Sequence, residues 1–386
     1  MNRPLVVLAT CMCLVGCGGG GGRAPAVRGP VAATLPPANP AAAGKMIQGA
    51  QAARDPRTTA RAIELFREAI AIDPTLWEAR YDLGVVLAQG GALADAEREL
   101  VAAAKIAPAE EDVAIALAET RRRRGSHKEA AAGLEAFVRA QPRVGPARTL
   151  LVTTLRDAGQ VDRAIVEARE VLAKRPGDAT ALSELSLCHL AKGERDTAHL
   201  LARQAVDANP GSAVAHRASG LVSLAEGEDA RAFQAFQKAA TLDARDTTAR
   251  LNMGAVLLRA GSYARAEEQY RAILAVAPDD AAAEVGLAVA LRGQADPRNP
   301  ARYDHAKAVL ERVIERDPHN TSALFNLGVL MMDHLKRADD AERAFARFLA
   351  EAPADHPARA DAERWAVELA ARRGAPGASG KPGGAK

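Results

Sequence analysis

The pair of residues that could most readily do chemistry is a cysteine followed by a histidine, Cys188-His189, because an imidazole can activate a thiol as a nucleophile. Cys188 falls two places after the small residue Ser186, inside an apolar stretch, so we expect a packed thiol that is not reactive. The chain has eight histidines, and none forms a pair at ligand spacing on one helix. The sequence therefore predicts no metal site.

Sequence motifs of catalysis give no better candidate. The chain contains no GxSxG, no HExxH, no Walker loop and no dinucleotide-binding fingerprint. A run of glycines from Gly18 to Gly22 precedes no strand or helix that could use it to hold a phosphate. We therefore expect a protein that is not an enzyme, with no catalytic residue, no cofactor and no small-molecule substrate.

Charge is concentrated at one place, the four arginines Arg121 to Arg124. They could contact an acidic partner or phospholipid headgroups. The alternative, which we favour, is the solvated C-terminal end of a helix, where positive charge suits the helix dipole. The formal net charge of only +3 argues against a nucleic-acid-binding protein, which usually has a clear basic excess on one face.

The elements that must position these residues belong to a unit of 34 residues that repeats along the chain. In each unit a proline follows the recurring alanine twelve residues later, with only Ala244 out of step. A fixed period of this length indicates a solenoid of stacked supersecondary units. The recurring alanines are Ala62, Ala96, Ala130, Ala164, Ala198, Ala232, Ala266, Ala306 and Ala341.

Composition and local pattern indicate that each unit is helical. Apolar residues make up 48% of the chain but aromatic residues only 3%, so the core must consist mainly of Ala, Leu and Val, as suits α-helices. Leu83, Val86 and Leu87 share one helical face, and Gly84 on that face lets a second helix approach closely. Each proline lacks an amide hydrogen and so ends a helix near its predecessor.

The clearest unit runs Glu-Ala-Arg-Tyr-Asp-Leu-Gly from Glu78, followed by Gly91, Ala96, Leu100 and Pro108, and it resembles the tetratricopeptide repeat. The resemblance implies an all-α fold, an α-α superhelix of about nine helix-turn-helix repeats. Val152, at a position where the repeat has a small residue, predicts a wider helix crossing. We place units starting near residues 43, 77, 111, 145, 179, 213, 247, 281 and 321 of an array over 43–355, then a capping helix over 356–373 with Trp365, Val367 and Leu369, and a tail over 374–386.

The N-terminus has the pattern of an export signal. Residues 1–16 carry one basic residue and an apolar run too short to span a bilayer. Their end, Leu14-Val15-Gly16-Cys17, resembles the lipobox of bacterial lipoproteins, which implies acyl chains such as palmitate on Cys17 as a membrane anchor. An ordinary signal peptide with an incidental cysteine is the alternative. Gly18, which is not Asp, favours the outer membrane facing the periplasm, and residues 17–42 form a flexible tether.

In tetratricopeptide arrays the first helix of each unit lines a concave groove, through positions two, five, six, nine and twelve. The front of this groove is polar and the back is largely apolar, so the back needs either a partner or a place in the core. The carboxylate clamp of the family is missing. The positions of the groove correspond to Tyr81, Glu119, Arg122, Thr149, Thr153, Arg156, Arg217, Leu221, Leu251, Asn252, Val285, Phe325, Asn326, Val329 and Met332.

The resemblance implies a scaffold that binds a protein partner in this groove. Lipoproteins of this kind resemble pilotins, assembly factors of secretins and gliding-motility proteins, so the expected partner is a component of an envelope machine. The alternative is an accessory protein of polysaccharide or glycan export, for which sugar-binding aromatic residues would be expected. Only Tyr81 and Phe325 offer such a platform in the groove.

Overall fold

The computed structural model describes residues 37–142, 145–296 and 300–374 of the chain. The described residues form nineteen α-helices and one short 3-10 helix, with no β-strand among them, so the predicted all-α fold class is confirmed. Cys17, the signal peptide and the tail from residue 375 lie outside the described residues. The chain divides into two compact units, Met1–Glu194 and Arg195–Lys386.

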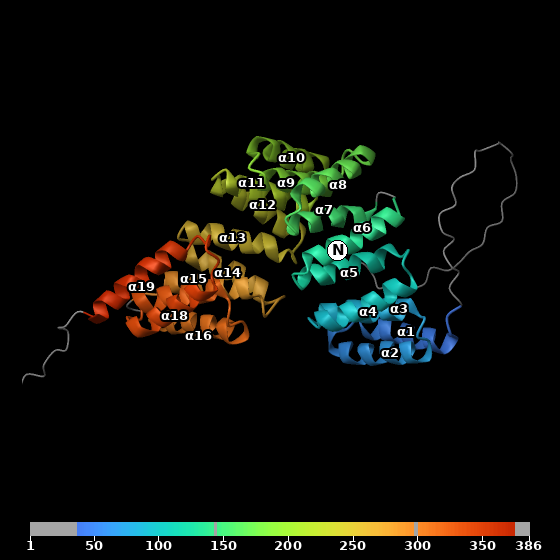
Figure 1. Ribbon diagram of the computed structural model, residues 1–386, viewed down its shortest axis with the longest axis horizontal. Helices are drawn as coiled ribbons and strands as arrows, with labels where there is room; N and C mark the ends of the chain where they lie inside the picture. The colour runs from blue at the N-terminus through green and yellow to red at the C-terminus, as the bar shows by residue number, and fades with distance from the viewer. Residues whose placement is uncertain (1–36, 143–144, 297–299, 375–386) are drawn as a thin grey trace, which may run out of the picture. The chain divides into compact units, whose positions relative to one another are not determined.

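The first unit consists of antiparallel helical hairpins that follow one another in chain order (Figure 1). Its first helix ends before Asp55-Pro56, where the short 3-10 helix begins. Helices α3, α5, α7 and α9 are the first helices of their hairpins. The elements are α1 (Pro40–Ala52), η1 (Pro56–Thr58), α2 (Thr59–Ile72), α3 (Trp77–Gln89), α4 (Leu93–Ile106), α5 (Glu111–Arg123), α6 (His127–Ala140), α7 (Pro146–Asp157), α8 (Val161–Lys174) and α9 (Ala179–Ala191).

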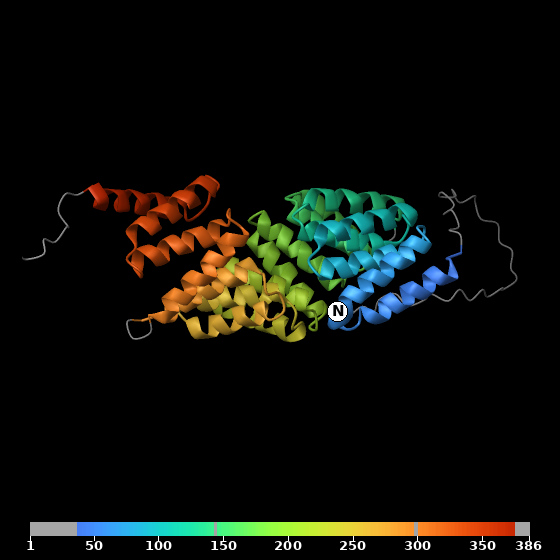
Figure 2. The ribbon, with the colours of Figure 1, turned by 90° about the horizontal axis from the view of Figure 1, so that it is seen from below.

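The second unit repeats the same hairpin and ends in one additional helix. Helices α11, α13, α15 and α17 are first helices, and α19 packs against α18 at the end of the array (Figure 2). The elements are α10 (Arg195–Ala208), α11 (Ala213–Ala225), α12 (Asp229–Leu242), α13 (Thr247–Arg259), α14 (Tyr263–Leu274), α15 (Ala281–Gln294), α16 (Ala301–Arg316), α17 (Thr321–Asp333), α18 (Ala338–Glu351) and α19 (Arg359–Gly374).

Turn and cap residues explain why the hairpins recur so regularly. Gly91 and its five equivalents have φ between 68° and 83°, a left-handed conformation that glycine adopts without steric cost. Lys336, with φ 54°, takes this role in the last hairpin. Most first helices of the second unit begin with a polar cap, such as Asp246, whose carboxylate accepts a hydrogen bond from the Ala249 amide at 2.9 Å.

The two helices of a hairpin cross at a pair of residues sixteen positions apart whose sizes compensate each other. A Cβ atom on Gly84 would lie 2.6 Å from Leu100 Cγ, and one on Gly254 would lie 2.6 Å from the Tyr270 ring. In the fourth hairpin the larger Val152 falls opposite Ala168, and both are fully buried. The small partner offsets the size of Val152, and the wider crossing of this hairpin stays a prediction.

The last helix, α19, covers the end of the second unit with a face that contains two of the three expected residues, Trp365 and Leu369. Ala362 and Leu369 are buried, and the Trp365 ring lies 5.5 Å from that of Phe345. Val367 is 70% exposed, so its predicted place on the apolar face is wrong. The reason is helical periodicity, since residues 362, 365 and 369 share a face and residue 367 lies on the opposite side.

Candidate functional site

A groove of about 690 Å³ lies on the first unit, where three successive first helices, α3, α5 and α7, stand next to one another. The segment between α8 and α9, with the start of α9, closes one side of it. Aliphatic, hydroxyl and carboxylate side chains all contribute to the wall. The lining residues are Tyr81, Val85, Gln89, Asp112, Ile115, Ala116, Glu119, Pro146, Thr149, Leu150, Thr153, Arg175, Asp178 and Thr180.

Several residues that the sequence assigned to the front of the groove do line it, namely Tyr81, Glu119, Thr149 and Thr153. The sequence analysis missed Val85, Asp112, Ile115 and Thr180, which also line it. These four occupy the second, fifth or ninth place of units that start at residues 77, 111 and 179. The repeat period could therefore have identified them, had it been applied to every unit.

Two predicted groove residues, Arg122 and Arg156, do not line the groove but brace neighbouring first helices. Arg122 Nη2 lies 2.6 Å from Asp157 Oδ2, which joins α5 to α7. Arg156 Nε lies 2.9 Å from Glu184 Oε2, which joins α7 to α9. All four side chains are at most about a quarter exposed, so the two positive charges are already compensated within the wall.

The whole arginine run serves the same structural purpose. Arg121 and Arg124 both pair with Glu97 on α4, and Arg123 Nη1 donates to the Ala88 carbonyl at the end of α3 at 2.6 Å. Burial alone would raise the pKa of Glu97, but the hydrogen bonds from the two arginines lower it overall. The run therefore holds α3, α4 and α5 together at their ends.

The residues predicted for the back of the groove pack against the core of the second unit. Val285 is buried, with 8% of its surface exposed, so it is a core residue and not a contact surface. Leu251, Phe325, Val329 and Met332 are partly buried and contact the same core cluster, and Leu221 packs against a neighbouring one. Val285 therefore belongs to the core, while the other residues of the strip pack against the core and keep part of their surface exposed.

Aromatic stacking covers Phe325 in particular. Its ring centroid lies 5.8 Å from that of Trp365 on α19 and 5.3 Å from that of Phe348 on α18. Asn252 and Asn326 each donate their side-chain amide to a carbonyl of their own helix at 2.9 Å.

Arg217, also predicted for the groove, lies in an ion pair with a helix cap. Its Nη1 is 2.6 Å from Oδ2 of Asp246. Arg217 is thus already paired, and the apolar strip of the second unit packs against the core. The polar groove of the first unit is therefore the candidate site.

A buried carboxylate stands in α3 next to the groove residue Tyr81. Asp82 is 2% exposed, and its Oδ1 atom has no hydrogen-bond partner among the described residues. Burial, together with the charge of Glu78 one turn earlier, raises the pKa of Asp82 to about 7. Asp82 therefore changes its charge near neutral pH.

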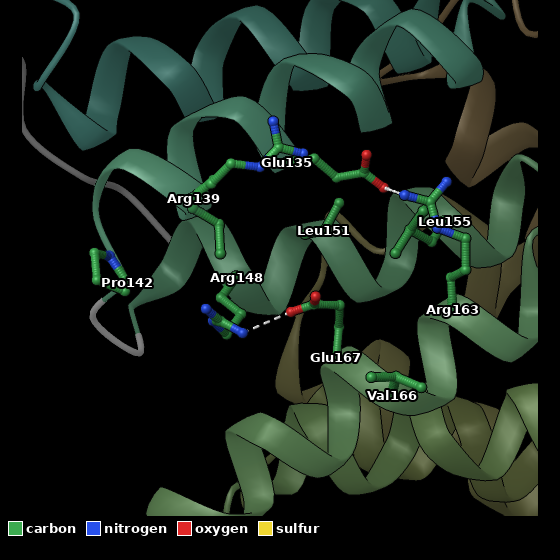
Figure 3. Close-up of a pocket in the computed structure, with 10 residues that line it drawn as sticks. Glu135, Arg139, Pro142, Arg148, Leu151, Leu155, Arg163, Val166 and Glu167 are labelled. Carbon is green, nitrogen blue, oxygen red and sulfur yellow. Dashed lines mark hydrogen bonds and ion pairs between the residues drawn. The ribbon is translucent and has the colours of Figure 1, made fainter.

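Another pocket, of about 370 Å³, lies among α6, α7 and α8 and is lined by Arg139, Arg148 and Arg163 (Figure 3). Arg148 pairs with Glu167 at 2.7 Å, and Arg163 pairs with Glu135. The same link between the two helices of a hairpin occurs two units earlier, between Arg80 and Glu99 at 2.9 Å. Because it recurs, we interpret this cluster as a brace of the hairpin.

The intervening hairpin lacks this brace and has an apolar pocket instead. Ala114 and Gly133 stand where Arg80 and Glu99 stand one unit earlier, and they line a pocket of about 310 Å³ among α4, α5 and α6. The small residues Ala114 and Gly133 at these two positions thus explain the pocket. Nothing in its lining indicates what would occupy it.

The Cys188-His189 pair is structural. Burial raises the pKa of the Cys188 thiol to about 12, so it is protonated at neutral pH, and His189 Nδ1 lies 2.5 Å from Glu194 Oε2. Among the described residues no three His, Cys, Asp or Glu side chains converge as metal ligands would. Nor does any described helix combine the length and hydrophobicity needed to cross a bilayer.

Family profiles described as "Tetratricopeptide repeat" match residues 53–120, 149–213, 189–247, 251–297 and 301–356, which is more than half of the chain. The chain therefore belongs to the tetratricopeptide repeat family. No curated protein sequence matches it significantly.

Solved structures that are similar to this chain share little sequence identity with it. The structure of the APC/C hetero-tetramer Cut9-Hcn1 is 17% identical with a TM-score of 0.56, covering 87% of this chain and 71% of that one. A tetratricopeptide repeat protein from Parabacteroides merdae ATCC 43184 is 17% identical with a TM-score of 0.44, covering 67% and 98%. YrrB, described as a tetratricopeptide repeat protein with an unusual peptide-binding site, is 20% identical with a TM-score of 0.36, covering 50% and 97%.

Proposed function

We propose that this protein is a scaffold that binds an extended segment of a protein partner in the groove of its first unit. One observation supports this most directly, namely that three successive first helices contribute to a single groove of about 690 Å³. Packed helices lie about 8–10 Å apart, so three of them span about 16–20 Å. An extended chain rises about 3.3 Å per residue, so the groove has room for about five or six residues.

A test of this proposal places a bulky side chain inside the groove and an identical one outside it. Thr153 lines the groove, whereas Glu170 is exposed on α8 and does not. We expect Thr153→Trp to abolish partner binding and Glu170→Trp to leave it unchanged. Photo-crosslinking from these two positions in cells would identify the partner. Equal retention of one partner by both variants would show that the groove is not the binding site.

We further propose that a lipid on Cys17 attaches this scaffold to the bacterial envelope, facing the periplasm from the outer membrane. The support is the sequence Leu14-Val15-Gly16-Cys17 at the end of a short apolar run. We expect Cys17→Ser to abolish labelling with a palmitate analogue and to release the protein from the membrane fraction. Unchanged labelling of that variant would rule out this anchor.

The partner that we propose is a component of an envelope machine such as a pilus, a secretin or the gliding apparatus. The groove supports a protein partner because its wall combines apolar, hydroxyl and charged side chains. Deletion of the gene is expected to impair pilus assembly, secretion or gliding. A defect in polysaccharide export alone would instead favour the glycan-export role.

A further inference from the structure

The pocket among α6, α7 and α8 contains more positive charge than the brace of its hairpin uses (Figure 3). Arg148 pairs with Glu167 at 2.7 Å. Arg163 pairs in the same way with Glu135. Arg139 also lines the pocket and is exposed, and it forms no ion pair or hydrogen bond within the part of the chain that the structure describes. Three guanidinium groups therefore meet two carboxylates, and the surplus is one positive charge.

A buried hydrogen-bond donor of the same pocket also lacks a partner. The Nε atom of Arg148 is buried and has no acceptor among the described residues. In the hairpin two units earlier Arg80 makes the same brace, and there Nε donates to the Pro74 carbonyl at 3.3 Å. A buried donor without an acceptor is destabilising, so an acceptor that a bound molecule brings to Arg148 would be favoured.

The apolar part of the lining includes a side chain that solvent reaches. Val166 on α8 is 59% exposed although it lines the pocket. Val138, Leu151 and Leu155, which line the pocket with it, are buried. An aliphatic group placed here would remove the exposed surface of Val166 from water, which is favourable in proportion to the apolar area covered.

The hairpin of Arg80 shows that these features are not required by the brace. Two periods of 34 residues before Arg139 and Val166, the chain has Ala71 and Arg98. The hairpin with the same brace thus has an alanine in place of the unpaired arginine and a cation in place of the exposed valine. The surplus charge and the exposed apolar surface are therefore particular to the pocket of α6, α7 and α8.

The charge of the pocket suits a carboxylate. A guanidinium group can donate two parallel hydrogen bonds to the two oxygens of one carboxylate. An ordinary carboxyl group is ionised at neutral pH and carries a single negative charge. A ligand with two negative charges suits the pocket less well, because among the described lining residues only Arg139 is a cation without a paired carboxylate.

We propose that this pocket binds a monocarboxylic acid with a short aliphatic tail. The carboxylate accepts hydrogen bonds from the Arg139 guanidinium and from Arg148 Nε. The tail lies on Val166, Leu151 and Leu155. The volume of about 370 Å³ is within the range of small-molecule sites, about 300–1,000 Å³. The pocket and the groove share no lining residue, so this inference goes beyond the proposed function and does not depend on it.

The experiment titrates the full chain with two acids and their neutral counterparts by isothermal titration calorimetry. Octanoate stands for a free fatty acid and is compared with 1-octanol. N-acetylleucine stands for the C-terminal leucine of a protein and is compared with N-acetylleucinamide. We expect at least one acid to have a dissociation constant about tenfold lower than its counterpart, because hydrogen bonds to charged groups are stronger than neutral ones. The acid that binds more tightly identifies the source of the carboxylate.

Matched variants assign the binding to the pocket. Arg139→Gln should weaken the acid about tenfold and leave its neutral counterpart unchanged. Arg169→Gln, at an exposed arginine of α8 outside the pocket, should change neither. Val166→Ser should weaken the acid and its counterpart alike, because both place a tail on this residue. Val276→Ser, at a valine of the second unit that is 57% exposed, should change neither.

The outcomes separate this inference from the proposed function. The inference is wrong if neither acid binds, if both acids bind no more tightly than their neutral counterparts, or if Arg139→Gln binds the acid as well as the unmodified chain. Thermal melts by circular dichroism check that each variant is folded. Thr153 lines the groove and not this pocket, so Thr153→Trp should bind the acid normally. Crosslinking from Thr153 decides the proposed function whatever the acids do.

Discussion

The two units build their hairpins alike but differ in the side chains at the fifth position of their first helices. In the first unit this position carries Tyr81, Ile115 and Thr149, which line an open groove. In α13, α15 and α17 of the second unit it carries Leu251, Val285 and Phe325, which pack against the core, although Leu251 and Phe325 keep part of their surface exposed. At the same position α9 has the buried Ser183 and α11 has Arg217, which is paired with Asp246. The comparison teaches that the repeat fixes the backbone, while the side chain at this position sets the chemistry of each helix face.

The cores of the two units also differ in their largest residues. The second unit buries Phe236, Phe345 and Phe348 completely, whereas the first relies mainly on leucines and alanines around Phe66. In the second unit Phe345 and Phe348 join Phe325 and Trp365 in one aromatic cluster. We therefore expect the second unit to be the more sensitive to loss of a single ring.

The largest effect is expected for Phe345→Ala, which should reduce the free energy of unfolding by about 3–5 kcal/mol because it leaves a cavity in the aromatic cluster. Each unit has one tryptophan, Trp77 in the first and Trp365 in the second. Denaturant unfolding in a Trp77→Phe background would follow the second unit through Trp365 fluorescence. A loss below about 1 kcal/mol would contradict the role that we assign to this cluster.

A smaller effect is expected for Gly254→Ala in the second unit. Its Cβ atom would lie 2.6 Å from the Tyr270 ring, which cannot retreat because Gly286 approaches the same ring from α15. We expect a loss of about 2 kcal/mol in thermal or denaturant unfolding.

A second substitution tests whether close contact causes that loss. Adding Tyr270→Leu should restore most of the stability, because the pair then matches Ala118 and Leu134 of the first unit. If the double variant is no more stable than Gly254→Ala, overpacking is not the cause.

The third prediction concerns the pH dependence of the first unit. The pKa of Asp82 is about 7 in the folded chain against an ordinary value of 3.8, so the folded state binds the proton more tightly than the unfolded state. The stability from this group is complete below about pH 4 and is lost as the pH rises through about 7.

Asp82→Asn should remove this slope. At about pH 8 the variant should gain up to about 4 kcal/mol over the unmodified chain, and at about pH 4 it should gain almost nothing. Melting temperatures between these pH values check the prediction. The control is Asp162→Asn, since the Asp162 side chain is 86% exposed. If the melting temperatures of the unmodified chain and of Asp82→Asn change in parallel with pH, the Asp82 carboxyl group does not titrate as described.

The smallest effect is a gain, expected for Gly133→Ala in the first unit. This glycine lies inside α6, and its added Cβ would meet only the end of the Arg121 side chain, at 3.3 Å. Alanine favours the helix over glycine by about 0.5–1 kcal/mol, so the melting temperature should rise slightly. Gly44→Ala on α1, where a Cβ meets nothing within 4 Å, is the matched control. If the melting temperature falls for Gly133→Ala but not for Gly44→Ala, the Arg121 side chain cannot move away from the added Cβ atom.

The sequence determined the all-α fold class and the hairpin because the signals for both are local. A proline that cannot continue a helix, a glycine that can adopt a left-handed turn and a small residue at each crossing act within one 34-residue period. For the same reason the period could place residues such as Tyr81 and Thr153 on the groove face of their helices.

Only the tertiary structure decided which of those faces stays open. Phe325 is covered by Trp365, and Arg122 is compensated by Asp157, in each case by a residue on a later helix. A face is buried or exposed according to what packs on it, and that depends on contacts between side chains distant in the sequence. The periodic pattern is identical for a face that packs on the core and one that lines a groove, so it could not distinguish the apolar strip of the second unit from the groove of the first.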